Sequence, residues 1–300
     1  MLQFTRPGLR LAALVALLVS VMGAGATASA PRQAPVPASL PSPLSFVSFL
    51  DLECFQTEPY QPPDTVVVTR HLNPVLADLP EEKTRLGVRE ELCVPVAKDD
   101  QVPPPDVLPF IEFVDLSCYR IEGERVHVPL QLDHLNPLLA EQLPPRDVVM
   151  FLPTQLCVPV MKDGVAPPEE VRRLVSFIDL KCYLEEPPEA VGLTLTLTHL
   201  NPVLVDRIPR HEVVVVENRE LCVPVQKNDE QVPDDVLNII RWIDMEKYLI
   251  ETEPLWAPVT LTLDHLNPSL AGLPTERATL IDARHLMVPV AKNGEFPPER

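Results

Sequence analysis

A seven-residue pattern written four times constrains this chain more than any other feature. In its clearest copy, residues 221–227, the pattern reads Leu-Cys-Val-Pro-Val-Gln-Lys, and the other copies begin at Leu92, Leu156 and Leu286. A second block begins 43 or 44 residues before each copy, at Phe49, Phe113, Phe177 and Trp242. A third marker, His-Leu-Asn-Pro, lies between them at His71, His134, His199 and His265. Three markers in a fixed order predict four tandem repeats.

The markers place the repeats at residues 45–108, 109–172, 173–237 and 238–300. Residues 1–30 combine a positively charged start, an apolar run and a final Ala-Ser-Ala, which together predict a secretory signal peptide. An uncleaved N-terminal anchor is the competing interpretation. Residues 31–44 carry five prolines and are expected to form a stiff linker. No later segment is apolar for long enough to cross a bilayer. We therefore expect a soluble, secreted protein that is extracellular, periplasmic or at the cell surface.

The chain is acidic, with a formal net charge of −18. Such a surface repels phosphate backbones, which excludes nucleic acid as an expected partner. It does not favour anionic membranes either, and solubility is the simplest meaning of the charge. Hydrophobic residues make up 46% of the chain, which is enough to form packed cores.

The six cysteines occur as one pair in each of the first three repeats, 39 or 40 residues apart. In the fourth repeat both are replaced together, by Lys247 and Met287, as expected if the two positions are partners. For an exported protein this predicts three intra-repeat disulfides. They are Cys54–Cys93, Cys118–Cys157 and Cys182–Cys222. A zinc site or a redox motif would need cysteines at closer spacing.

Each predicted disulfide closes a loop long enough to stabilise a small domain by about 3–4 kcal/mol. The fourth repeat has no such bridge, but it contains both tryptophans of the chain, Trp242 and Trp256. We expect that burial of these aromatic side chains, together with packing on the third repeat, offsets the missing bridge.

The third repeat shows the expected secondary structure most clearly. Residues 176–184 are apolar and aromatic, residues 193–198 alternate leucine with threonine, and residues 213–216 and 220–226 predict two further strands. Pro224 in the last of these suggests a sheet edge or a bulge. A polar turn follows the strand, and prolines and acids such as those at residues 167–170 predict the start of a short helix. The sequence thus predicts a mainly β protein of four small tandem domains in an elongated arrangement. Each domain would hold about four strands and a short helical turn.

Three sets of repeated residues are candidates for binding. His71, His134, His199 and His265 are the candidate ligand-binding residues, although a histidine at this place can also simply fix the turn after a strand. The repeated aspartates and lysines can pair with each other or contact a partner. They are Asp51, Asp115, Asp179 and Asp244, with Lys98, Lys162, Lys227 and Lys292. The aromatic residues Phe55, Tyr119, Tyr183 and Tyr248 suit either a glycan platform or cross-strand packing.

No enzyme signature occurs in the sequence. It has no phosphate-binding glycine loop, no nucleophile-elbow serine and no His-Glu-x-x-His motif. A catalytic site is usually a single asymmetric group of residues, whereas the candidates here recur as framework residues do. We expect no catalytic activity, no cofactor and no metal.

Cys-Tyr followed by Leu-Cys-x-Pro-x-x-Lys resembles a tandem domain of unknown function in secreted bacterial proteins. The resemblance is carried best by Cys118-Tyr119 with residues 156–162 and by Cys182-Tyr183 with residues 221–227. The sequence departs from the pattern at Phe55, and at Lys247 and Met287. The resemblance implies an exported bacterial protein built from repeats, and it implies no activity.

These observations favour a non-catalytic secreted or cell-surface protein that acts as a structural or adhesive spacer, or as a binding array. Its expected partner is a protein or glycan at the cell surface. The alternative is a ligand-binding protein in which each domain carries a weak glycan or metal site and the tandem copies supply avidity.

Overall fold

The computed structural model describes residues 39–300, and these form a mainly β structure, as predicted. The strands are β1 (Leu52–Tyr60), β2 (Val66–His71), β3 (Glu82–Arg85), β4 (Arg89–Lys98), β5 (Leu116–Arg120), β6 (Val128–His134), β7 (Arg146–Lys162), β8 (Leu180–Glu186), β9 (Ala190–His199), β10 (His211–Lys227), β11 (Met245–Thr252), β12 (Val259–His265) and β13 (Glu276–Lys292). The helices are α1 (Pro43–Ser48), η1 (Pro74–Leu76), α2 (Leu108–Ile111), α3 (Pro137–Ala140), α4 (Glu169–Val175) and α5 (Asp234–Ile240).

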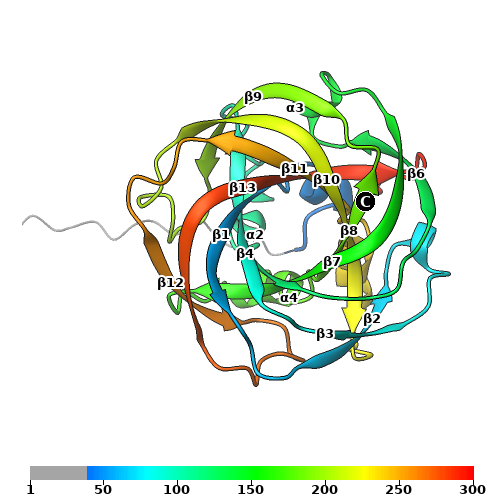
Figure 1. Ribbon diagram of the computed structural model, residues 1–300, viewed down its shortest axis with the longest axis horizontal. Helices are drawn as coiled ribbons and strands as arrows, with labels where there is room; N and C mark the ends of the chain where they lie inside the picture. The colour runs from blue at the N-terminus through cyan, green and yellow to red at the C-terminus, as the bar shows by residue number, and fades with distance from the viewer. Residues whose placement is uncertain (1–38) are drawn as a thin grey trace, which may run out of the picture. The chain divides into compact units, whose positions relative to one another are not determined.

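Eight of the strands pair into a closed antiparallel ring, which Figure 1 views end-on. The ring runs β1–β4–β5–β7–β8–β10–β11–β13 and returns to β1. Each repeat contributes two neighbouring strands. The joint between β13 and β1 links the fourth repeat to the first, with Met287 opposite Leu52. The ring therefore has no free edge.

Of the remaining strands, β2, β6, β9 and β12 join repeats that are two apart in the chain, while β3 pairs with β2 in its own repeat. β12 pairs with the start of β13 in its own repeat, and it also pairs with the end of β7, where Leu263 lies opposite Lys162. β2, β6 and β9 make the same second pairing with β10, β13 and β4. The prediction of four separate domains in an elongated arrangement thus differs from what we find, because one sheet runs through all four repeats.

The two last strands predicted in the third repeat are a single strand, β10. Its pairing with β9 and β11 shifts between Val215 and Glu217, so the residue between them is a bulge rather than a strand end. In the first repeat the equivalent strand is broken into β3 and β4. There Gly87 donates its N–H to the Arg120 carbonyl at 2.8 Å, and a Cβ on Gly87 would lie 2.8 Å from that oxygen. Only glycine fits so close an approach.

Pro224 is not at the edge of the sheet, although the sequence suggested an edge or a bulge there. It pairs with Leu180 of β8 on one side. On the other side, the pairing of β10 with β11 ends at Cys222 and the pairing with β2 begins at Val225. The proline therefore stands where β10 changes partners, a place at which no N–H is needed.

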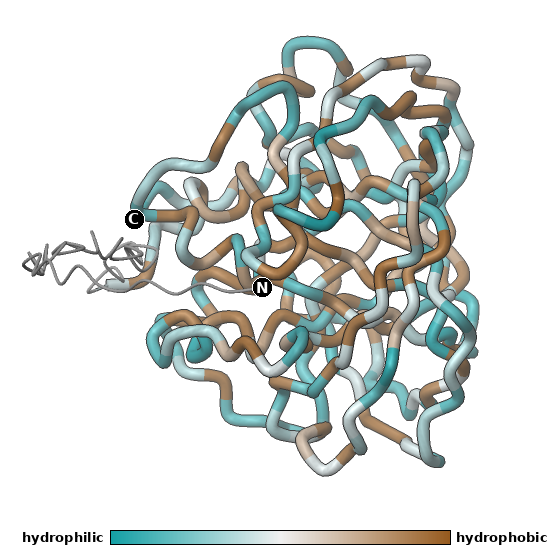
Figure 2. The backbone as a smooth tube through the Cα atoms, turned by 90° about the vertical axis from the view of Figure 1, so that its left-hand side faces the viewer, coloured by the Kyte–Doolittle hydropathy of each residue, from teal (hydrophilic) through white to brown (hydrophobic). Residues whose placement is uncertain are grey.

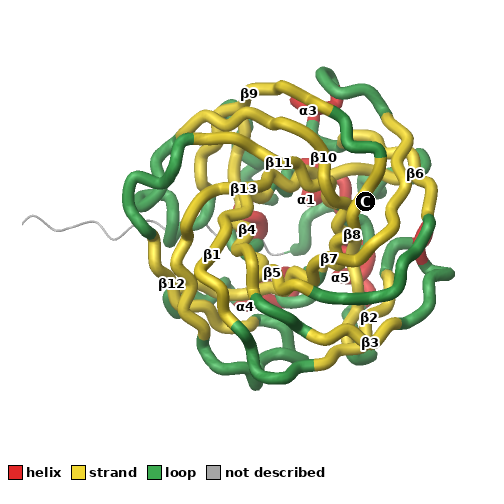
Figure 3. Tube along the Cα trace, viewed as in Figure 1, coloured by secondary structure: helices red, strands yellow, loops and turns green. Residues whose placement is uncertain are grey.

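Four short helices, α1, α2, α4 and α5, each precede the first strand of a repeat (Figure 3). The helix predicted after residue 167 is confirmed as α4. Phe46, Phe110, Leu174 and Ile240 from these helices pack in one hydrophobic core with all six cysteines. Figure 2 shows hydrophobic stretches through the middle of the sheet and hydrophilic stretches at the outer turns. The helices therefore cover one end of the ring.

The predicted signal peptide lies outside the described residues, as does most of the predicted linker. The last two residues assigned to the linker, 43 and 44, belong to α1. Among residues 39–300, no helix is long and apolar enough to cross a membrane.

Candidate functional site at the open end of the ring

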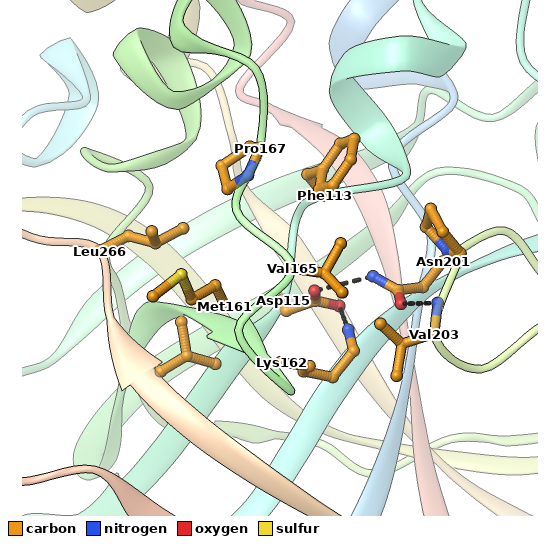
Figure 4. Close-up of a pocket in the computed structure, with 11 residues that line it drawn as sticks. Phe113, Asp115, Met161, Lys162, Val165, Pro167, Asn201, Val203 and Leu266 are labelled. Atoms are coloured by element: carbon orange, nitrogen blue, oxygen red, sulfur yellow. Dashed lines mark hydrogen bonds and ion pairs between the residues drawn. The ribbon is translucent and has the colours of Figure 1, made fainter. Parts of the chain in front are cut away.

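The repeated aspartates and lysines are paired with each other. In each repeat the lysine ammonium contacts the aspartate carboxylate, and both side chains are buried. Figure 4 shows the pair of the second repeat, Asp115 and Lys162, with Asn201 beside them. Burial raises the pKa of the Asp115 carboxyl and lowers the pKa of Lys162, because both charged forms have left water. These residues are therefore framework, which was one of the two interpretations of the sequence.

The asparagine of each His-Leu-Asn-Pro marker completes such a pair in the preceding repeat. Asn201 Nδ2 donates to Asp115 at 2.9 Å, while its Oδ1 accepts from the Val203 N–H at 2.9 Å and so caps the turn. Asn136 and Asn267 make the same bonds to the first and third repeats. Asn73 of the first repeat donates to Asp244 of the fourth at 2.6 Å. We call each group of aspartate, lysine and asparagine a triad. The four triads thus link each repeat to the next in the same circular order as the strands of the ring.

His71, His199 and His265 are buried, the side chain of the half-buried His134 is also covered, and the structure does not bring the four together. Each instead faces the repeated aromatic residue of the repeat two along. In three cases a tyrosine hydroxyl contacts the histidine Nε2. The pairs are His71–Tyr183 at 2.9 Å, His134–Tyr248 at 3.1 Å and His265–Tyr119 at 3.3 Å. In the fourth case, His199 faces Phe55, which has no hydroxyl.

The aromatic residues are buried in the hydrophobic clusters between the ring and the outer strands. Cross-strand packing is therefore the correct interpretation of Phe55 and the three tyrosines. A glycan platform needs exposed rings, and these four do not provide one.

The three predicted disulfides are present: Cys54–Cys93, Cys118–Cys157 and Cys182–Cys222. They line the inside of the ring, where Cys93 and Cys118 of adjacent bridges lie 3.7 Å apart. In the fourth repeat Lys247 lies opposite Met287 at the equivalent place. The expectation that two buried tryptophans replace this bridge is wrong, because Trp256 is 95% exposed. A polar cluster takes the place instead.

We call this group the axial cluster: Lys247 with Glu91, Gln155, Glu220 and His285. The Lys247 ammonium donates to Glu91 Oε2 at 2.6 Å and to Gln155 Oε1 at 2.8 Å, and it lies 3.0 Å from Glu220 Oε2. His285 Nδ1 lies 2.5 Å from Glu91 Oε1. The four other residues of the axial cluster each stand two places before the second cysteine position of their repeat. They are Glu91, Gln155, Glu220 and His285. Each repeat thus sends one polar side chain from this position to the centre, a glutamate in the first and third repeats, a glutamine in the second and a histidine in the fourth.

The electrostatics of the axial cluster favour its charged forms. Burial opposes charge on Lys247, but Glu220 and Glu91 outweigh it and raise the pKa of the ammonium. Burial likewise opposes charge on Glu91, yet Lys247 and His285 hold the pKa of that carboxyl well below its usual range. The amine of Lys247 is therefore held protonated and has no lone pair to offer a substrate.

A pocket of about 360 Å³ opens beside the axial cluster, at the end of the ring away from the helices. Glu91, Gln155 and His285 form part of its wall. Charged and amide side chains make up most of the remainder, and Pro59 and Val88 are its apolar residues. The residues of this remainder are Gln56, Thr57, Pro59, Val88, Arg89, Glu90, Arg120 and Arg284. Its volume lies within the range usual for small-molecule sites.

The sequence analysis did not identify the axial cluster. Glu91, Gln155, Glu220 and His285 are invisible as a motif, because the repeats share only a polar character at this position. Two features of the sequence point to them together. The residue at this position is polar in every repeat but is not the same in neighbouring repeats, and one of the four repeats lacks its cysteines.

Comparisons with protein-family models, with curated proteins and with solved structures found no match for this chain. The resemblance to a tandem domain of secreted bacterial proteins therefore stays a prediction.

Proposed function

We propose that this chain is a non-catalytic, exported binding protein whose ligand site is the pocket beside the axial cluster. One observation carries the proposal: beside a pocket, several residues that break the four-fold repeat gather at one place. The repeated polar residues are used in building the ring, in the triads and in the histidine–aromatic pairs. At Lys247 and the four residues around it the repeats differ in charge, and a pocket opens there.

The wall of the pocket indicates the class of ligand. Arg284 and Arg120 are exposed cations, of which Arg120 is paired with Glu90, while Glu90 and Glu91 are anions. Apart from Pro59 and Val88, the side chains are polar, and among the described residues no tryptophan, tyrosine or phenylalanine ring lines the wall for a sugar to stack on. We therefore infer a small zwitterion, with a carboxylate toward Arg284 and an ammonium toward the glutamates.

Three observations support the rest of the proposal. The disulfides suit an oxidising compartment, which favours export. The sharing of one sheet among all repeats favours a single rigid binding body over a chain of spacer modules. The protonated state of Lys247 disfavours amine chemistry beside the pocket.

The proposal is tested by titration calorimetry of the purified, oxidised protein with four ligand types. These are free amino acids as zwitterions, dicarboxylates, diamines and neutral sugars. We expect binding in the zwitterion series. Arg284→Gln should weaken that binding about tenfold or more, because it removes a charged hydrogen-bond donor. Arg219 is the matched control, since it occupies the equivalent position of the third repeat and does not line the pocket.

Equal affinities for Arg284→Gln and Arg219→Gln would place the ligand elsewhere and contradict the proposal. Silence across all four series would also contradict it, and would return the protein to the role of spacer or adhesin.

A second candidate site follows from one of the predicted histidines. His71 lines a pocket of about 780 Å³ together with Tyr183, Glu82 and Glu122. His71 thus stands beside a solvent-accessible cavity. The predicted ligand-binding role of the histidines is therefore best supported at His71. Its test is whether His71→Gln, rather than Arg284→Gln, abolishes binding.

A further inference from the structure

We propose that Glu53, His199 and His211 form a binding site for a divalent transition-metal ion, with Zn²⁺ as the best match. His211 Nε2 lies 2.8 Å from Glu53 Oε1, and His199 Nε2 lies 3.1 Å from Glu53 Oε2. One donor atom from each residue falls within 4.8 Å of the other two. Two imidazoles and a carboxylate are a usual donor set for zinc.

The separations suit a metal. Bonds of about 2.0–2.1 Å in tetrahedral geometry put donor atoms about 3.3 Å apart, so small outward movements of these side chains would admit the ion. His211 contacts the Pro209 carbonyl through Nδ1 at 3.0 Å. With its proton on Nδ1, His211 turns the Nε2 lone pair toward Glu53, as second-shell hydrogen bonds do for metal-binding histidines.

Buried atoms of this group lack hydrogen bonds. His199 is almost fully buried, and neither of its ring nitrogens makes a hydrogen bond to any residue in the range 39–300. Glu53 Oε2, although close to His199 Nε2, also makes none. Buried polar atoms without partners are costly, and a bound ion would satisfy His199 Nε2 and Glu53 Oε2 at once.

The equivalent places in the other repeats show what this group lacks. Glu82 is paired with Lys181, Arg146 with Glu246, and Glu276 with Arg89. In each case a lysine or arginine neutralises the carboxylate. Glu53 contacts no lysine or arginine within the described part of the chain, and its ionic contacts are the two histidines.

Because Phe55 has no hydroxyl, His199 lacks the hydrogen-bond partner that the other marker histidines have. At the three other places a tyrosine hydroxyl contacts the marker histidine. Phe55 stands in the tyrosine position opposite His199, so that the Nε2 atom is left facing the carboxylate. The replacement of tyrosine by phenylalanine and the presence of a second histidine, His211, thus occur at the same one of four equivalent places.

The other acid- and cysteine-containing clusters are not metal sites. Cys54 with Cys93 and Cys182 with Cys222 lie close to Glu91 and Glu220, but these cysteines are consumed in disulfides. His211 is half-buried, so an ion can reach the proposed site from solvent.

The test is a calorimetric titration of the purified, oxidised protein with ZnCl₂, with Co²⁺ as a spectroscopic probe. We expect a single zinc ion per chain, a rise in melting temperature, and visible Co²⁺ bands typical of low coordination number. His211→Ala should weaken binding by more than the ~10–100-fold that loss of a second-shell partner costs. The matched control His127→Ala replaces an exposed histidine and should bind as the parent does.

Phe55→Tyr gives a test that removes no ligand. The added hydroxyl would bond His199 Nε2, as in the other three repeats, and should weaken zinc binding while the fold is kept. No zinc binding to the parent protein overturns the proposal, and so does equal binding by the parent and His211→Ala. Octahedral Co²⁺ bands would also overturn it, since they indicate a surface-bound hydrated ion.

Discussion

The ammonium of Lys247, in the fourth repeat, lies 2.6 Å from the Glu91 carboxylate of the first repeat. In the other repeats a cysteine stands at this position and forms a disulfide within its own repeat. The lysine instead forms a contact between two repeats. The fourth repeat has exchanged a covalent bridge for an ionic one.

Replacing Lys247 with methionine should destabilise the protein by about 3–5 kcal/mol, because Glu220 would stay buried without a cation and Glu91 would keep only His285 beside it. Urea unfolding followed by circular dichroism measures the change. The triple variant that adds Glu91→Gln and Glu220→Gln should recover much of the loss. If Lys247→Met alone is neutral, the axial cluster does not contribute to stability.

A fourth disulfide should form when Lys247→Cys and Met287→Cys are combined. The two residues are direct partners across β11 and β13, as Cys182 and Cys222 are across β8 and β10. Non-reducing peptide mapping should find the new bridge beside the three native ones. Two free thiols at these positions would show that the fourth repeat cannot close as the others do.

Acid should destabilise the protein partly through Glu91. Its pKa in the folded state is below the ordinary value of 4.5, so its contribution to stability is present above that value and is lost as the pH falls below it. Urea unfolding measured between about pH 5 and pH 2 should therefore show a shallower decline for Glu91→Gln than for the parent. Glu58→Gln, at an exposed position, is the control and should follow the parent curve.

The Asp115–Lys162 pair should show strong coupling in a double-mutant cycle. Asp115→Asn alone leaves a buried ammonium without a countercharge and is expected to cost about 3–5 kcal/mol. Asp115→Asn combined with Lys162→Met removes both charges and should cost less than the sum of the two single changes. Additive losses in denaturant unfolding would argue that the two charges do not interact.

Removing the Cys182–Cys222 bridge by paired alanine substitutions should lower the free energy of unfolding by about 2–5 kcal/mol. The β8–β10 pairing around it should survive, because backbone hydrogen bonds hold the same residues opposite each other. Denaturation with and without reductant measures the effect, and a parent protein insensitive to reductant would refute it.

The sequence was sufficient to predict what each repeat does locally. The cysteine partners, the alternating strand that became β9 and the helix that became α4 follow from spacing and periodicity. Partner choice between repeats could not be predicted, because backbone hydrogen bonds carry no side-chain signature and four similar repeats offer several equivalent partners. The pairing of Leu263 with Lys162, two repeats away, is an example.

The same limit applies to the candidate sites. Asp115 and Lys162 recur identically, so pairing was one obvious interpretation of them. Glu53 and His211 could not be linked in the sequence, because they are 158 residues apart and belong to no shared motif. They come within bonding distance only because β9 of the third repeat pairs with β4 of the first.

The hydrogen-bonded joint between β13 and β1 makes the order of contacts circular, even though the chain is linear. A circular permutant that starts in the turn after Lys227 and links the old ends would keep every strand pairing of the ring. The number of repeats cannot be changed in the same way. In a ring of three or five repeats, the outer strands would no longer meet the strands of the repeat two places along as they do here.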